Sequence, residues 1–134
     1  MKFISFVSTC FILLSIVGCT VPTQPKLSTV SEDETRVPDG MGQLIIYRTN
    51  LYGIMKSPTI AVNGNVKGGC EFQSALFLNL EPGNHRVSLD TVNFEVEIKA
   101  NQRIYASCIP WMLKVVDAAT GASKIKGLDY QGTY

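Results

Sequence analysis

Short apolar runs separated by turn residues fill the chain from Gly42 onward. Several of these runs alternate between apolar and polar positions, as half-buried β-strands do. No stretch carries an apolar stripe of helical spacing over about ten residues. The predicted strands cover residues 44–47, 59–62, 75–80, 85–90, 93–99, 103–109 and 112–117. The pattern predicts an all-β domain over residues 42–134, a small antiparallel β-sandwich of about seven strands.

Two turn signals divide the predicted strands. Asn63-Gly64 follows the run at 59–62 and favours a tight hairpin, because both corners of such a turn need positive φ. Pro82-Gly83 favours a type II turn, with Gly in the left-handed position. His85 then opens the next strand, where its ring can bond a backbone group of the turn. The alternative, a ligand or general base at His85, would need Cys, Asp or Glu partners, and none has suggestive spacing.

The N-terminus has the features of a lipoprotein signal peptide over residues 1–18. Lys2 precedes an uncharged run of 16 residues, 3–18, which is shorter than the roughly 20 residues of a membrane-spanning helix. The run ends in Ile16-Val17-Gly18-Cys19, which resembles the lipobox of bacterial lipoproteins. That resemblance implies cleavage between Gly18 and Cys19 and attachment of membrane lipid to the Cys19 sulfur. An ordinary cleaved signal, or an uncleaved helix with a chance Cys, is the alternative.

Residues 19–41 are predicted to be a lipidated flexible linker, because they are rich in Pro, Ser and Thr and lack strand or helix periodicity. Thr20 follows the lipidated Cys where an inner-membrane retention signal would have Asp, so we expect an envelope protein on the outer membrane, facing the periplasm. A cluster of acids in the linker is interpreted as solvated, because it lacks the spacing of a calcium loop. These acids are Glu32, Asp33, Glu34 and Asp39.

Charge and composition narrow the function classes. The chain has 12 Lys and Arg against 11 Asp and Glu, and loss of Lys2 with the signal peptide makes it neutral. A nucleic-acid partner is therefore not expected, because phosphate contacts need a basic face. The single His and single Trp leave little material for a metal cluster or a base-driven active site. We assign no catalytic residue, no cofactor and no metal.

The four cysteines have different expected fates. Cys10 leaves with the signal peptide and Cys19 takes lipid, which leaves Cys70 and Cys108 as a pair in an oxidising compartment. We predict a disulfide between them, closing a loop of about 38 residues. Two free, half-buried thiols are the alternative. A redox or catalytic pair, including a Cys108 nucleophile assisted by His85, lacks the Cys-x-x-Cys spacing that lowers a thiol pKa.

Three segments together carry a family resemblance. Residues 45–48, 57–64 and 80–85, with the sequences IIYR, SPTIAVNG and LEPGNH, resemble the bacterial family known as domain of unknown function 2846, which has a PEGA-like sandwich and many small lipoproteins. The resemblance covers about residues 42–110 and rests on turn residues, so it implies a fold and no catalytic residues. This chain departs from plain members by holding Cys70 and Cys108.

The remaining hint concerns aromatic residues. Tyr47, Arg48, Tyr52 and Trp111 form a candidate binding patch, because Tyr, Trp and Arg are favoured at contact surfaces; packing within a small sandwich is the alternative. The tail 121–134 either adds an edge strand or stays mobile. We expect a membrane-anchored envelope lipoprotein whose non-catalytic sandwich binds an envelope protein or a glycan. The alternative is an envelope enzyme acting on cell-wall or lipid material.

Overall fold

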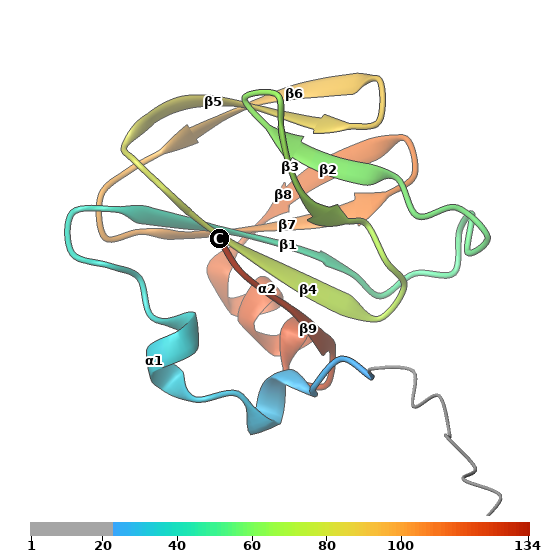
Figure 1. The fold of residues 1–134 in the computed structure, drawn as a ribbon, viewed down its shortest axis with the longest axis horizontal. Helices are drawn as coiled ribbons and strands as arrows, with labels where there is room; N and C mark the ends of the chain where they lie inside the picture. The colour runs from blue at the N-terminus through green and yellow to red at the C-terminus, as the bar shows by residue number, and fades with distance from the viewer. Residues whose placement is uncertain (1–22) are drawn as a thin grey trace, which may run out of the picture.

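The computed structural model describes residues 23–134, and in this part of the chain nine strands form two packed sheets (Figure 1). The strands are β1 Gly42–Arg48, β2 Thr59–Val62, β3 Asn65–Gly69, β4 Ser74–Leu80, β5 Gly83–Leu89, β6 Val92–Ile98, β7 Arg103–Ile109, β8 Met112–Val116 and β9 Asp129–Thr133. The first sheet has the order β8-β7-β1-β4-β9 and the second has the order β3-β2-β5-β6. The helical elements are η1 Leu27–Thr29, α1 Glu32–Thr35 and α2 Ala118–Ile125.

The main hydrophobic core lies between the two sheets. It contains buried apolar side chains from both layers, such as Leu44 and Leu78 of the first sheet and Val87 of the second. In β6 the burial alternates, with Val96 and Ile98 buried and Glu95 and Glu97 exposed, as the sequence predicted. All seven predicted strands are present, and the prediction of a β-sandwich is confirmed at the level of two packed, mostly β layers.

The predicted turns are present, although one has a different role. Asn63 and Gly64 have φ of 50° and 84° and join β2 to β3 as an antiparallel hairpin, as predicted. Gly83 has a positive φ of 138°, which is more extended than the roughly 80° of a type II turn. Pro82-Gly83 carries the chain from β4 in one sheet to β5 in the other. It is therefore a corner between the layers.

The prediction of a wholly antiparallel sandwich is wrong for the five-stranded sheet. There β1 pairs in parallel with β7, and β4 pairs in parallel with β9. All residues of β1 and nearly all of β4 are buried, because this sheet has a hydrophobic layer on both faces. Such two-sided burial is typical of strands with parallel neighbours. The tail of the chain is an ordered edge strand, β9.

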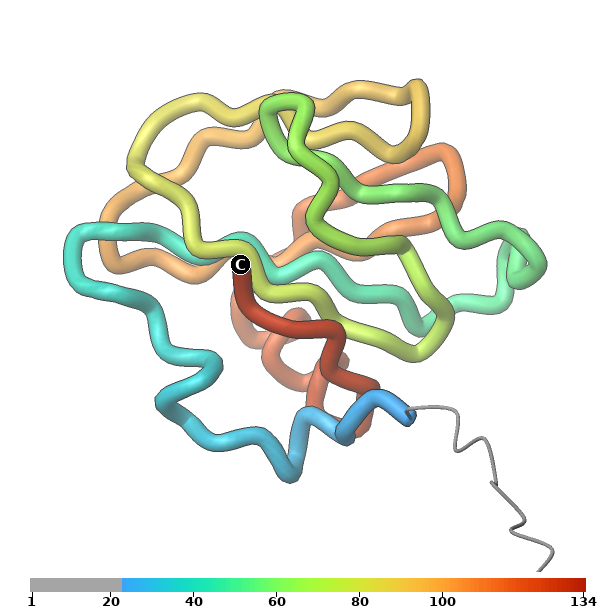
Figure 2. The backbone as a smooth tube through the Cα atoms, viewed as in Figure 1, coloured from blue at the N-terminus to red at the C-terminus, as the bar shows by residue number. Residues whose placement is uncertain are grey.

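A second, smaller core covers the outer face of the five-stranded sheet. There Phe77 of β4 packs edge-on against Tyr130 of β9, with ring centroids 5.6 Å apart. The tube in Figure 2 shows α2 and the N-terminal segment lying together on this face. Asp117 is the N-cap of α2, and the hydrogen bond that its carboxylate accepts from the Thr120 backbone N–H (2.8 Å) lowers the pKa of Asp117.

The described part of the predicted flexible linker, residues 23–41, is attached to the domain. The Leu27 N–H donates to the Leu128 carbonyl (2.8 Å), and the Tyr130 N–H donates to the Pro25 carbonyl (2.8 Å). Leu27 and Val30 pack against the second core. The linker prediction was therefore wrong for these residues: two apolar side chains and backbone pairing to β9 offset the ordering entropy that the polar composition suggested would dominate.

Gly121 permits the close approach of α2 to the sheet and gives a first prediction. A Cβ built on Gly121 would lie 2.2 Å from Cγ of Tyr105 on β7. We expect Gly121→Ala to lower the free energy of unfolding by about 1–3 kcal/mol, because the helix or the ring must move. Gly127→Ala is the matched control, since nothing lies within 4 Å of that Cβ. Equal unfolding midpoints for the two variants in urea would contradict this packing.

Candidate functional site

An exposed apolar surface lies at one end of the sandwich. It is formed by the loop between β1 and β2 and by the turn between β7 and β8. Its members are Leu51, Tyr52, Ile54, Met55, Trp111 and Met112, and we call them the apolar tip. Met55 is 94% exposed, Tyr52 72% and Trp111 57%. Large apolar side chains exposed together in this way mark a contact surface more often than isolated ones do.

The two loops of the apolar tip meet at Gly53. A Cβ added there would lie 2.7 Å from Cγ of Pro110 and 3.5 Å from Cζ3 of Trp111. Gly53 also has a positive φ of 61°, which L side chains rarely adopt. The loop has its own turns, in which the Ile54 N–H donates to the Leu51 carbonyl and the Lys56 N–H to the Gly53 carbonyl. The two loops that carry the exposed side chains therefore lie against each other.

Arg48, the last residue of β1, holds the β1–β2 loop of the apolar tip in place through hydrogen bonds to backbone carbonyls. Its side chain is fully buried. Nη1 donates to the Lys56 carbonyl (2.7 Å) and to the Cys70 carbonyl (2.9 Å), and Nη2 donates to the Tyr52 carbonyl (2.6 Å). One planar group thus fixes two points of the β1–β2 loop and one point of the chain after β3. Only an arginine side chain offers enough donors in a fixed fork for this arrangement.

The Arg48 charge is balanced by carbonyl dipoles. In the described residues Arg48 forms no ion pair, and its Nε is buried without a hydrogen-bond partner. Burial lowers the pKa of the Arg48 guanidinium. Placing a charge in such surroundings costs free energy, so the three hydrogen bonds must offset this cost.

The disulfide between Cys70 and Cys108 lies beside Arg48, and this prediction is confirmed. Cys70 follows β3 in the second sheet and Cys108 is on β7 in the first, so the bond joins the two layers. Both sulfurs are in the main core. The Asn50 amide donates to the Cys108 carbonyl (3.4 Å). The cross-link and Arg48 together hold the base of the apolar tip.

The structure divides the predicted binding patch. Tyr52 and Trp111 are exposed and belong to the apolar tip, but Tyr47 and Arg48 are buried, so the patch prediction was wrong for those two. Tyr47 points toward α2, where burial raises the pKa of its hydroxyl and the Asp117 carboxylate raises it further. Strand alternation could not place these side chains, because β1 is buried on both faces. The missed tip residues had a signal, an apolar sequence LYGIM without strand alternation.

His85 has the structural role that the sequence predicted. Its Nε2 lies 2.7 Å from the Glu81 carbonyl, and its Nδ1 lies 2.9 Å from the Asn63 amide nitrogen. The carbonyl can only accept, so Nε2 carries the proton and Nδ1 accepts from Asn63. The ring therefore joins the β4–β5 corner to the β2–β3 hairpin. Cys108 is in the disulfide, so a nucleophile assisted by His85 is not formed.

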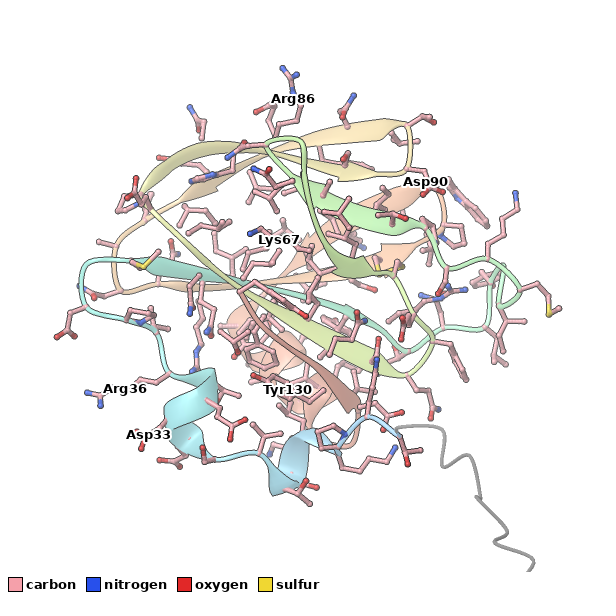
Figure 3. All side chains as sticks on the ribbon, in the orientation of Figure 1. Asp33, Arg36, Lys67, Arg86, Asp90 and Tyr130 are labelled. Carbon is pink, nitrogen blue, oxygen red and sulfur yellow. A yellow bond between two sulfur atoms is a disulfide. The ribbon has the colours of Figure 1, made fainter. Side chains whose placement is uncertain are left out.

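A shallow polar depression lies on the outer face of β5 and β6. Its volume is about 590 Å³, and its lining includes Asn63, Asn84, Asn93 and the exposed ion pair Arg86–Glu95 (3.2 Å). Figure 3 shows Arg86 projecting outward from this face. Amides and a charged pair can hydrogen-bond to hydroxyl groups. The depression is therefore a second candidate binding surface, polar where the apolar tip is hydrophobic.

Metal sites and relatives add no further assignment. Within residues 23–134 no group of three or more His, Cys, Asp or Glu side chains could hold a metal ion. No helix of that range is long and apolar enough to cross a membrane. The predicted signal peptide and Cys19 lie outside the described residues. No protein-family model, curated protein or solved structure matches this chain. The resemblance to the domain of unknown function 2846 family stays a prediction.

Proposed function

We propose that this protein is a membrane-anchored envelope lipoprotein whose β-sandwich is a non-catalytic binding module. The observation that carries the proposal is the apolar tip, an exposed contact surface that a buried arginine and a disulfide hold in place. Burial of such a surface in a complex or an interface would recover hydrophobic free energy. The polar depression is a second surface, suited to a glycan or an envelope protein.

Three further features support this proposal. A buried disulfide between the layers is typical of proteins that fold in an oxidising compartment. The sequence up to Cys19 resembles a lipoprotein signal with its lipobox. His85 uses both ring nitrogens to join the β4–β5 corner to the β2–β3 hairpin, which favours a structural role over general base catalysis. The resemblance of residues 42–110 to a family rich in lipoproteins points the same way.

The lipidation proposal is tested by Cys19→Ala. The expected result is an unprocessed, lipid-free precursor, because a thiol is needed to form the thioether with the lipid and cleavage follows that step. Mass spectrometry of the purified protein measures both the acyl mass and the new N-terminus. Cys10→Ala is the control and should be processed normally, since Cys10 lies inside the predicted apolar run. Wild-type protein that is cleaved but carries no acyl group would refute the proposal.

A further inference from the structure

We infer that the apolar tip inserts into the interface of the same bilayer that holds the lipid on Cys19. This inference rests on the proposed function and names the occupant of its contact surface. The other candidate occupants, a protein partner or a second copy of this chain, would leave the tip outside the lipid.

The composition of the two tip loops fits a membrane interface. Residues 49–57 and 109–112 hold one charged side chain, Lys56, and no acid. Trp and Tyr are the side chains most enriched at the level of lipid headgroups. The tip presents one of each, Trp111 and Tyr52, beside longer aliphatic side chains. A single lysine at this level can extend its ammonium group to lipid phosphates while its methylene stem stays in the apolar layer.

The described chain begins at the end of the sandwich that carries the tip. The Gln24 amide donates to the Glu71 carboxylate (3.3 Å), and Glu71 follows Cys70, whose carbonyl binds the Arg48 guanidinium. Figure 1 shows the start of the described chain and the β1–β2 loop on the same side of the domain. The described chain therefore begins near the base of the tip.

The tether between lipid and domain is short. Four residue steps separate Cys19 from Thr23, the first described residue, and a fully extended chain spans at most about 3.6 Å per step. The lipidated residue thus lies within about 14 Å of Thr23 in any conformation. Because residues 24–30 are bound to β9 and the second core, the domain cannot move away from the bilayer on a long leash.

The acids near this end lie at the rim of the tip and have hydrogen-bond partners. The Asp90 carboxylate, labelled in Figure 3, accepts from the Thr59 backbone N–H (2.8 Å). Glu71 accepts from the Gln24 amide. Both are outside the two tip loops, so shallow insertion of the tip leaves them in water. Insertion to the depth of the headgroup boundary, about 5–10 Å, is enough to cover the tip.

Trp111 is the only tryptophan in the chain, so its fluorescence reports on the tip alone. The test uses lipidated full-length mature protein, purified from the envelope and reconstituted in vesicles of phosphatidylethanolamine and phosphatidylglycerol. Part of the lipid is replaced by lipid brominated in the acyl chains. We expect a blue-shifted emission and roughly twofold quenching of Trp111 by the brominated lipid, as for a ring at the acyl boundary.

Two variants separate the tip from the anchor. Leu51→Ser with Met55→Ser should recover most of the Trp111 emission, although the protein still carries its acyl mass and floats with the vesicles. Val66→Ser is the matched control, because Val66 is also an exposed apolar side chain (69%) but lies on β3, outside the tip. This control should be quenched like wild type.

The outcomes distinguish this inference from the proposed function. Lipidated wild-type protein that floats with the vesicles while its Trp111 emission is unchanged by brominated lipid overturns tip insertion and leaves the anchor intact. Equal quenching in wild type and in the double serine variant overturns it as well. Protein without acyl mass that fails to float overturns the proposed function, and the inference falls with it.

Discussion

Replacing both Cys70 and Cys108 with Ala is expected to lower the free energy of unfolding by about 3–4 kcal/mol. The disulfide closes a loop of 38 residues, and cutting it returns the corresponding loop entropy to the unfolded chain. For a domain of this size we expect the unfolding midpoint to fall by roughly 15 °C. Urea unfolding of oxidised protein, compared with thermal scans, gives both quantities.

The location of the bond suggests a local effect besides the global one. The Cys70 carbonyl binds Arg48, and the Cys108 carbonyl binds Asn50 at the start of the β1–β2 loop. Loss of the cross-link should therefore loosen the base of the apolar tip before the sheets separate. Relative to wild type, the variant should show a larger increase in the rate of amide hydrogen exchange in residues 49–57 than in β5 and β6. Uniform acceleration across the domain would contradict this order.

Reductant is the control for this prediction. Under reducing conditions wild-type protein should unfold at a urea concentration close to that of the double alanine variant, because both then lack the same covalent bond. The variant itself should not respond to reductant. A stability difference that persists between the two reduced proteins would assign the effect to the packing of the sulfur atoms in the core and not to loop closure.

The strands of the second sheet could be predicted from the sequence because each is half-buried. In β5 and β6 one set of alternate residues faces the core and the other faces water, so apolar and polar letters alternate with the period of the strand. The Asn63-Gly64 turn could be predicted for a local reason as well, since few residues accept positive φ. A local sequence pattern is enough to predict a strand or a turn when its residue types are determined by the local environment.

The first sheet could not be predicted to the same depth, because its features depend on distant partners. The parallel pairing of β1 with β7 joins strands about 60 residues apart, and no periodicity reports it. Helix α2 has only eight residues, one of them Gly121, which is a poor helix former. That glycine is present because Tyr105 occupies the space of its side chain. The need for glycine at position 121 therefore comes from a tertiary contact, which the local sequence of the helix does not reveal.

The candidate site shows the same division. Tyr52 and Trp111 could be selected from the sequence because exposed aromatic residues in loops are common at contact surfaces. Arg48 was selected with them because arginine is also favoured at contact surfaces. Its burial depends on three carbonyls from two separate segments, and carbonyl groups leave no trace in the pattern of residue types. The burial of an arginine that has no carboxylate partner therefore could not be predicted from the sequence.

Arg48→Met is expected to lower the free energy of unfolding by about 2–4 kcal/mol. Methionine keeps most of the length of the side chain and removes the three hydrogen bonds. The Tyr52 and Lys56 carbonyls lie in an exposed loop and can turn to water, whereas the Cys70 carbonyl belongs to a residue that is buried in the core. The last group accounts for most of the cost, because in the variant this buried acceptor keeps only the long hydrogen bond from the Ser57 hydroxyl (3.4 Å).

The same variant should make the β1–β2 loop of the apolar tip more susceptible to cleavage by trypsin. In wild type the Lys56 carbonyl is bound by Arg48 (2.7 Å) and the Lys56 N–H by the Gly53 carbonyl (2.8 Å), so the backbone is held away from the extended form that trypsin needs. In Arg48→Met we expect a new and early cut after Lys56 under native conditions. Mass spectrometry of the two fragments identifies the site; both cysteines of the disulfide lie in the fragment after Lys56, so the two fragments are not covalently joined.

Arg86→Met is the matched control, because Arg86 is an arginine of the second sheet whose ion pair with Glu95 is exposed. Surface pairs of this kind contribute about 0–1 kcal/mol, so the control should unfold close to wild type and gain no cut after Lys56. Arg48→Lys should fall between Met and wild type, since one ammonium group cannot reach three carbonyls in the planar geometry of the guanidinium. If Arg48→Met and Arg86→Met are equally stable, the guanidinium does not hold the loop, and the order of the apolar tip must come from the contact of Gly53 with Pro110 and Trp111 instead.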